Sequence, residues 1–228
     1  MGHSLVKRLL LVALAVSSAA CSTTRALRPV GEKKVQVGGS LGGPLFTNLG
    51  PPYPAPLFNV YGRYGLTDKL TLELGLNPTV VRAFGIEAGA SYQLLKNDRF
   101  VPRVMIDGLL VFYVGLGGLT GQPRGSGTPF TAAPRLFQHL QGTAAWDVGP
   151  FTLYAGLNLF AQIERLIVLP TVLGGVEWRP VKSFGLQLEV KQMAFTQNQR
   201  FAVVEFLGPG NFGAFAVHLG VNVAPGAK

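Results

Sequence analysis

The sequence predicts an all-β protein, an antiparallel up-and-down transmembrane β-barrel of about ten strands, with about eight as the alternative. Two observations favour this fold. Apolar and polar residues alternate along most of the chain, as in strands that have one apolar and one polar face. Charged residues make up only 14% of the 228 residues, whereas an average soluble domain has about 25%. The 30 glycines and 16 prolines argue against a helical bundle.

The first twenty residues have the layout of an export signal. Lys7 and Arg8 precede an apolar stretch from Leu9 to Val16, and small residues continue to Ala20. This stretch is shorter than a membrane-spanning helix requires. We therefore predict a signal peptide over residues 1–20.

The only cysteine, Cys21, directly follows these small residues. Ser18-Ala19-Ala20-Cys21 resembles the lipobox of bacterial lipoproteins. The resemblance implies that the thiol of Cys21 carries diacylglycerol, that an acyl group such as palmitate anchors the chain, and that cleavage makes Cys21 the N-terminus. Ser22, where a retained inner-membrane lipoprotein has Asp, implies the outer membrane. Residues 21–33 would then be a lipidated linker. A free thiol after ordinary cleavage is the alternative.

Ten alternating segments follow and make up the predicted barrel, residues 34–223. The stretch from Lys69 to Leu76 places four leucines on one face and Lys, Thr, Glu and Gly on the other. The stretch from Leu109 to Val114 is continuously apolar and therefore less regular. Residues 224–228 are a predicted tail, and the predicted strands cover residues 34–43, 56–65, 69–78, 84–94, 100–114, 135–147, 150–161, 169–179, 183–194 and 212–223.

Short and long connections alternate between these strands. Outer-membrane barrels join their strands by short periplasmic turns and longer outward loops. An even strand number brings both chain ends to the turn side, so we expect a periplasmic, lipid-anchored N-terminus in the bacterial outer membrane. A β-sandwich is the soluble competitor, but it needs a more charged exterior. The short turns are 65–68, 96–98, 147–150 and 179–183; the loops are 44–55, 115–134, 162–168 and 195–211, with a brief connection at 77–79.

Aromatic residues flank the short turns, and we expect them to lie at the membrane interface, where an apolar ring meets a wet edge. A general preference of aromatic residues for strand ends is the alternative explanation. The residues concerned are Tyr64, Tyr92, Phe100, Trp146, Phe151, Trp178 and Phe184.

The residues opposite the leucine faces are polar and carry both charge signs, so we expect them to point into the barrel. Because buried charges must be paired, a lumen filled with ion pairs is the simplest interpretation. A small polar channel or an outward-open binding cavity is the alternative. The candidate lumen network comprises Arg63, Glu73, Glu87, Arg103, Asp107, Arg135, His139, Gln141, Glu177, Arg179, Glu189, Lys191 and His218.

No catalytic or metal-binding pattern stands out. Gly38–Gly42 matches G-x-S-x-G, but it lies in a predicted strand without the helix that this motif needs. A single cysteine provides no zinc-binding spacing. The isoelectric point is near 10.0, but the basic residues are scattered, so we expect no nucleic-acid partner. We likewise expect no enzymatic activity, no metal and no cofactor.

Three functions remain open. The leading one is a structural or partner-binding role in the envelope, with outward loops that bind an envelope protein and a surface in contact with outer-membrane lipids and lipopolysaccharide. The second is a narrow channel or small-solute transporter. The third is a periplasm-facing soluble barrel that binds an apolar ligand, which requires the apolar faces to point inward and the charged faces outward.

Overall fold

The computed structural model describes residue 25 and residues 27–47, 51–54, 57–79, 83–98, 100–115, 135–163, 167–198 and 206–225. The predicted signal peptide and the lipobox with Cys21 lie outside the described residues. So does most of the predicted loop 115–134. No helix in the described part of the chain is long and apolar enough to cross a membrane.

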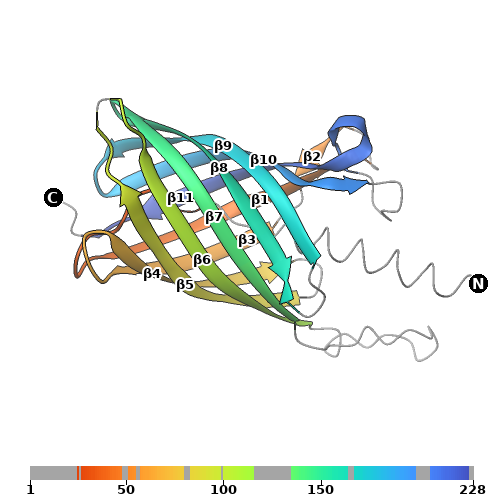
Figure 1. Ribbon diagram of the computed structural model, residues 1–228, viewed down its shortest axis with the longest axis horizontal. Helices are drawn as coiled ribbons and strands as arrows, with labels where there is room; N and C mark the ends of the chain where they lie inside the picture. Colours follow the sequence, from red (N-terminus) through yellow and green to blue (C-terminus); the bar gives the residue numbers. More distant parts are fainter. Residues whose placement is uncertain are drawn as a thin grey trace, which may run out of the picture.

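In the described part of the chain, ten long strands form a closed antiparallel barrel, and one strand of two residues pairs with the end of a long strand (Figure 1). Each long strand pairs with its neighbours in the sequence, and β11 pairs back with β1, where Val37 lies opposite Val223. The prediction of a ten-stranded up-and-down barrel is therefore confirmed. The strands are β1 (Val35–Phe46), β2 (Tyr53–Pro54), β3 (Leu57–Gly65), β4 (Leu70–Thr79), β5 (Ala83–Leu95), β6 (Arg103–Gly115), β7 (Arg135–Val148), β8 (Phe151–Gln162), β9 (Ile167–Val181), β10 (Phe184–Asn198) and β11 (Phe212–Val223).

Several connections are shorter than the sequence predicts. β9 continues to Val181 and β10 begins at Phe184, so the turn between them contains only residues 182–183. β4 continues to Thr79 through the residues predicted as a brief connection. Pro78 pairs with Phe84 of β5 and lies beyond the last pair between β4 and β3. A residue without an N–H is tolerated at such an edge position. The short β2 pairs with the end of β1, inside the predicted loop 44–55.

The two faces of each strand differ as the alternation predicts. On β4, Leu72, Leu74 and Leu76 are 43%, 61% and 45% exposed. Glu73 and Asn77, the polar residues beside them, are only 4% and 1% exposed. The apolar faces therefore form the outer wall and the polar faces line the lumen. The soluble barrel with an apolar interior requires the opposite arrangement, and these exposures contradict it.

Glycines make room for aromatic side chains inside the barrel. Three lumen tyrosines each lie across from a glycine on the neighbouring strand. A Cβ added to any of these glycines would come within 2.6 Å of the tyrosine opposite, so any other residue would force the ring to shift. Part of the glycine content thus follows from packing a narrow lumen. The pairs are Tyr61 with Gly38, Tyr113 with Gly85 and Tyr154 with Gly175.

Candidate functional site: the interior of the barrel

Arg63 on β3 organises a buried polar network on one side of the lumen. Its guanidinium donates hydrogen bonds to Oε1 of Glu73 at 2.7 Å, to Oε1 of Gln36 at 3.0 Å and to Oγ of Ser91 at 2.8 Å. Arg63 is 2% exposed and Glu73 4% exposed. The Arg63–Glu73 pair is direct because the two residues lie opposite each other on β3 and β4.

A second carboxylate, Glu87 on β5, lies next to this network. It accepts hydrogen bonds from the side-chain amides of Asn59, at 3.2 Å, and of Asn77. Two neutral amides stabilise a carboxylate but do not neutralise it. Lys191 of β10 interacts electrostatically with Glu87, and a further positive charge comes from outside the strands.

The N-terminal segment, residues 25 and 27–34, supplies that charge from inside the lumen. The guanidinium of Arg25 is 3.4 Å from Oε2 of Glu73 and also forms an ion pair with Glu87. The main-chain oxygen of Arg25 accepts a hydrogen bond of 3.1 Å from Nε2 of Gln187 on β10. These partners belong to β4, β5 and β10, so Arg25 bridges the lumen. Burial lowers the pKa of Arg25 but Glu87 and Glu73 raise it, and the net shift is upward.

Wall side chains also hold the main chain of this segment. Arg103 donates from Nε to the main-chain oxygen of Leu27 at 2.7 Å, and Arg63 donates to that of Arg28 at 3.0 Å. Leu27 itself is 2% exposed and packs in one cluster with Ala145, Tyr154 and Leu173. The sequence predicts a linker over residues 21–33. Within that stretch, Arg25, Leu27 and Arg28 lie at the turn end of the barrel, where their side chains and carbonyls contact the wall.

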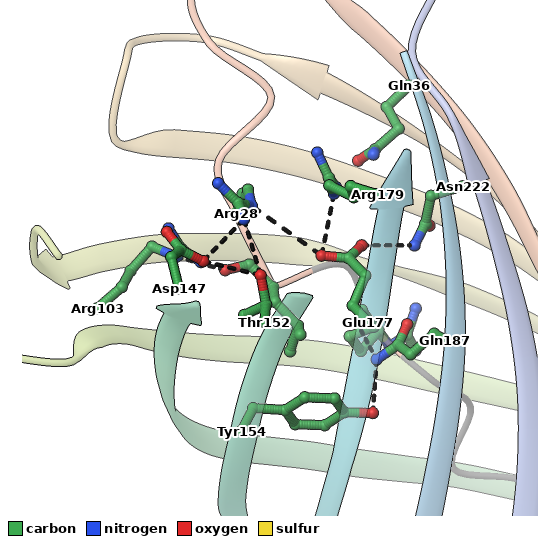
Figure 2. Close-up of polar contacts among 12 residues, drawn as sticks. Arg28, Gln36, Arg103, Asp147, Thr152, Tyr154, Glu177, Arg179, Gln187 and Asn222 are labelled. Carbon is green, nitrogen blue, oxygen red and sulfur yellow. Dashed lines mark hydrogen bonds and ion pairs between the residues drawn. The ribbon is translucent and has the colours of Figure 1, made fainter. Parts of the chain in front are cut away.

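Arg28 connects the segment to two further carboxylates (Figure 2). Its Nη2 is 2.7 Å from Oδ1 of Asp147, and its Nε is 4.0 Å from Oε2 of Glu177. Arg103 binds both oxygens of Asp147 at 3.0 and 3.1 Å, and Arg179 is 3.0 Å from Glu177. Burial and the nearby Arg103 lower the pKa of Arg28, against the opposing effect of Asp147. Cations are thus crowded at this end of the lumen.

The segment also balances the charge of the lumen as a whole. Among the described side chains, the inward-facing carboxylates outnumber the cations of the strands by two, and Arg25 and Arg28 make up the difference. Because buried charges are costly unless paired, the segment belongs electrostatically to the barrel. The carboxylates are Glu73, Glu87, Asp107, Asp147, Glu177 and Glu189; the strand cations are Arg63, Arg103, Arg179 and Lys191.

The other side of the lumen carries a second polar group. Nζ of Lys191 is 2.9 Å from Oε1 of Glu189. The hydroxyl of Tyr154 donates to Oε2 of Glu189 at 3.0 Å and accepts from Nε2 of Gln187 at 2.7 Å. Because Gln187 also binds the main chain of Arg25, the segment joins the two polar groups into one.

The structure places most of the predicted lumen residues inside the barrel. Asp107 and Gln141 lie directly opposite each other on β6 and β7. Arg179 is only half-buried, and the side chain of Arg135 lies outside the description. Within the described residues, no group of three or more His, Cys, Asp or Glu side chains could hold a metal ion. The predicted lumen residues that are at most 5% exposed are Arg63, Glu73, Glu87, Arg103, Asp107, His139, Gln141, Glu177, Glu189, Lys191 and His218.

The predicted interface aromatics lie around the turn end of the barrel. Phe184 is half-buried, and the others point outward. Their exposed fractions range from 41% to 84%, for Tyr64, Tyr92, Phe100, Trp146, Phe151 and Trp178.

An apolar layer, which the sequence analysis missed, crosses the lumen near its loop end. The rings of Phe137 and Phe160 stack at 4.9 Å, and Tyr113 meets Phe137 edge-on at 5.7 Å. Leu57 of β3 packs against this layer. The sequence signal for this layer is the continuous apolar run from Leu109 to Val114, because it makes both faces of β6 apolar. The apolar layer consists of Val111, Tyr113, Phe137, Phe160, Leu169, Met193, Ala194 and Ala216.

Comparisons with known proteins find similarity only among solved structures. No protein-family model and no curated protein matches the chain. The chain is similar to the NanC porin, with 12% identity and a TM-score of 0.44 over 83% of this chain and 98% of that one. It is also similar to the N-terminal β-barrel domain of Pseudomonas aeruginosa OprF (12% identity, TM-score 0.33, 85% and 98% covered). A third is Ail, the attachment invasion locus protein of Yersinia pestis, with 9% identity and a TM-score of 0.25 over 85% of this chain and 98% of that one. The barrel fold of this chain rests on its own strand pairing.

Proposed function

We propose that this protein spans a bacterial outer membrane as a closed β-barrel with a structural or partner-binding role in the envelope. The observation that carries the proposal is the apolar outer wall. Val60, Leu74, Leu110, Leu153 and Leu219, from five different strands, are each 51–61% exposed. A soluble monomer rarely exposes so continuous an apolar surface. Acyl chains cover it without cost, and a closed barrel leaves no strand edge unpaired in hydrocarbon.

Two closures of the lumen favour an envelope component over an open pore. The N-terminal segment fills the turn end, with Arg25 and Leu27 only 3% and 2% exposed. The apolar layer crosses the loop end, where Phe137 and Phe160 are each 2% exposed. An aqueous channel needs a continuous polar path, and an apolar constriction blocks ions by excluding water. The channel alternative therefore requires both closures to move.

The two tryptophans of the chain provide a direct test of membrane insertion. Trp146 and Trp178 are 41% and 42% exposed near the turn end. The full chain is folded into vesicles whose lipids carry bromine either near the headgroup or near the end of the acyl chain. We expect both bromine positions to quench the tryptophan fluorescence, the shallow position more strongly, because aromatic side chains favour the interface. Vesicles without bromine are the control. Fluorescence that is indifferent to bromine at either depth contradicts membrane insertion.

The lipid anchor at Cys21 is part of the proposal and has its own test. Cells that express the full chain are grown with radiolabelled palmitate. The lipobox resemblance predicts label on the wild-type protein and none on a Cys21→Ser variant. Label on both proteins, or on neither, contradicts acylation at Cys21. The tryptophan experiment is independent of this result.

The partner-binding role is assigned to the loop end. There β2 folds back on β1, and Tyr53 is 39% exposed. The ring of Phe46 lies 5.8 Å from that of Tyr53 and 5.2 Å from that of Phe206. Rigidly positioned loops with exposed aromatic side chains are common recognition surfaces. Cross-linking in whole cells from a photoreactive residue at position 53 tests this role. A cross-link to an envelope protein is expected, and its absence at this position contradicts recognition through β2.

A further inference from the structure

Four polar side chains form a row on the lumen side of four neighbouring strands. Asp107 of β6 lies opposite Gln141 of β7. Gln141 also lies opposite Asn158 of β8, which in turn lies opposite Thr171 of β9. All four residues are at most 2% exposed. His139 precedes Gln141 on the same inward face of β7 and is 1% exposed. These five residues are called the polar belt.

Much of the hydrogen-bonding capacity of the polar belt is unused among the described residues. Oδ1 of Asp107 and Oε1 of Gln141 are buried without a partner there. The same holds for both ring nitrogens of His139 and for both polar atoms of the Asn158 amide. Turning the ring or the amide over therefore changes nothing. Because a buried polar group without a hydrogen bond is costly, folded proteins leave few such groups unsatisfied, so the belt needs partners.

The polar belt lies between the two closures of the lumen. On β8, Asn158 lies between Phe160 of the apolar layer and Tyr154, which packs in the cluster with Leu27. A partner at the belt is therefore enclosed from both ends, and a molecule as small as water reaches it most easily. The same order holds on β7, with Phe137, His139, Gln141 and Ala145, and on β9, with Leu169, Thr171 and Leu173.

We propose that the polar belt binds a cluster of ordered water molecules, enclosed between the two closures. The belt offers acceptors at Asp107 and Gln141, and both a donor and an acceptor at Asn158. Water matches this mixture, because it donates and accepts hydrogen bonds and is held in proteins by two to four polar partners. A bound cation matches it less well, since Arg25 and Arg63 already attract the carboxylate of Asp107.

The enclosed water would give the lumen a polar compartment that is separate from the solvent at either end. Hydrogen bonds through water would connect side chains of the belt that come from different strands. The inference goes beyond the proposed envelope role, because it concerns the interior of the barrel whatever medium surrounds the outer wall.

Oxidation by hydroxyl radicals, generated with X-ray pulses, tests the cluster. Radicals formed from a bound water molecule oxidise the side chains beside it even when these are buried. The full chain is irradiated in neutral detergent, and oxidised residues are identified by mass spectrometry. We expect oxidation of His139 but not of Met193 in the apolar layer, although both are 1% exposed and methionine is intrinsically easier to oxidise. An unmodified His139, or equal oxidation of both residues, overturns the proposal.

Rapid mixing with water that carries heavy oxygen shows whether the cluster is enclosed. At the shortest mixing times, oxidised His139 should still carry ordinary oxygen, and the heavy isotope should enter only later. Tyr53, which is 39% exposed at the loop end, is the control and should take up the heavy isotope at once. Immediate uptake at both residues would mean that solvent passes freely through the lumen, and this overturns the enclosed cluster.

Asn158→Leu tests the belt itself. Leucine has a similar shape but neither donor nor acceptor, so most of the oxidation of His139 should be lost. Gln162→Leu is the matched control, because Gln162 lies on the same strand beyond Phe160 and is 7% exposed. This variant should be oxidised at His139 like the wild type. Unchanged oxidation of His139 in folded Asn158→Leu overturns the assignment to the belt, and the two wild-type measurements decide the proposal should that variant not fold. None of these results depends on the tryptophan quenching, so the two proposals fail separately.

Discussion

Arg25 is the residue on which the closed turn end most depends. It pairs with Glu73 and Glu87. Arg63 also pairs with Glu73, and Lys191 interacts electrostatically with Glu87. The side chains of Asn59 and Asn77, which donate hydrogen bonds to Glu87, are neutral amides. Removing one partner of a buried pair leaves an uncompensated charge, which costs far more than the pair itself contributes.

We expect Arg25→Met to lower the free energy of unfolding by about 3–5 kcal/mol. Methionine keeps most of the side-chain volume, so the change reports the charge. Denaturant unfolding in micelles, followed by tryptophan fluorescence, measures it. Lys33→Gln is the control, because its ion pair with Glu32 joins side chains that are 82% and 52% exposed. It should leave the stability nearly unchanged. Equal effects of the two substitutions contradict an ion-paired Arg25 in the lumen.

The inward direction of single charged residues follows from sequence, but their partners do not. Alternation on β3 and β4 points Arg63 and Glu73 to the same face, which predicts their burial. Arg25 lies in a stretch without alternation, so nothing in the sequence places it near Glu87. Its contacts arise only once the barrel has closed around the segment, and closure is a property of all the strands together.

At the scale of the strands, the glycines opposite the tyrosines decide how tightly neighbouring strands pack. A Cβ on Gly38 would lie 2.5 Å from Cζ of Tyr61, which is itself 2% exposed. Gly108 of β6 also lies in a strand but has nothing within 4 Å of such a Cβ. The two glycines therefore form a matched pair of positions, one crowded and one open.

Gly38→Ala should destabilise the barrel by about 1–3 kcal/mol, since the ring of Tyr61 has to move within a packed lumen. Gly108→Ala should be neutral or slightly stabilising, because alanine restricts the unfolded chain. Thermal unfolding of both variants in micelles gives the comparison. A destabilisation of similar size at both positions would show that strand propensity, rather than contact with Tyr61, is responsible.

Strand positions could be predicted from the sequence more reliably than strand ends. The ten alternating segments correspond to the ten long strands, but β9 extends to Val181 where a turn was expected. Strand ends depend on hydrogen bonds to the neighbouring strand, and these bonds are not encoded in the alternation. The apolar layer was missed for a related reason. Phe137 and Phe160 belong to segments that were assigned a polar inner face, and one face can change its character along a single strand.

At the scale of the whole molecule, the two closures predict the electrical behaviour of the barrel. The wild type should give no single-channel steps in a planar bilayer. Deletion of residues 25–34 should still give none, because the apolar layer remains. The same deletion combined with Phe137→Ser and Phe160→Ser should open a path. That path should favour cations, since the remaining described wall has two more carboxylates than cations.

The single deletion separates the roles of the two closures. If it conducts, the apolar layer is not a seal and the segment alone closes the lumen. If the wild type itself conducts, the closed-barrel proposal is wrong. Quenching of Trp146 and Trp178 by brominated lipid verifies in each case that the variant has inserted, so a silent trace is not mistaken for a missing protein.

The seam between β1 and β11 has a consequence for biogenesis. Val37 pairs with Val223, so the β1–β11 pair can form only once β11 has been synthesised. The N-terminal segment directly precedes β1, and it has to be inside when that seam closes or be threaded in afterwards. Until then the six carboxylates of the wall remain hydrated, and the apolar strand faces that carry the leucines remain exposed. Closure of this barrel should therefore be a late, all-or-none event that waits for β11.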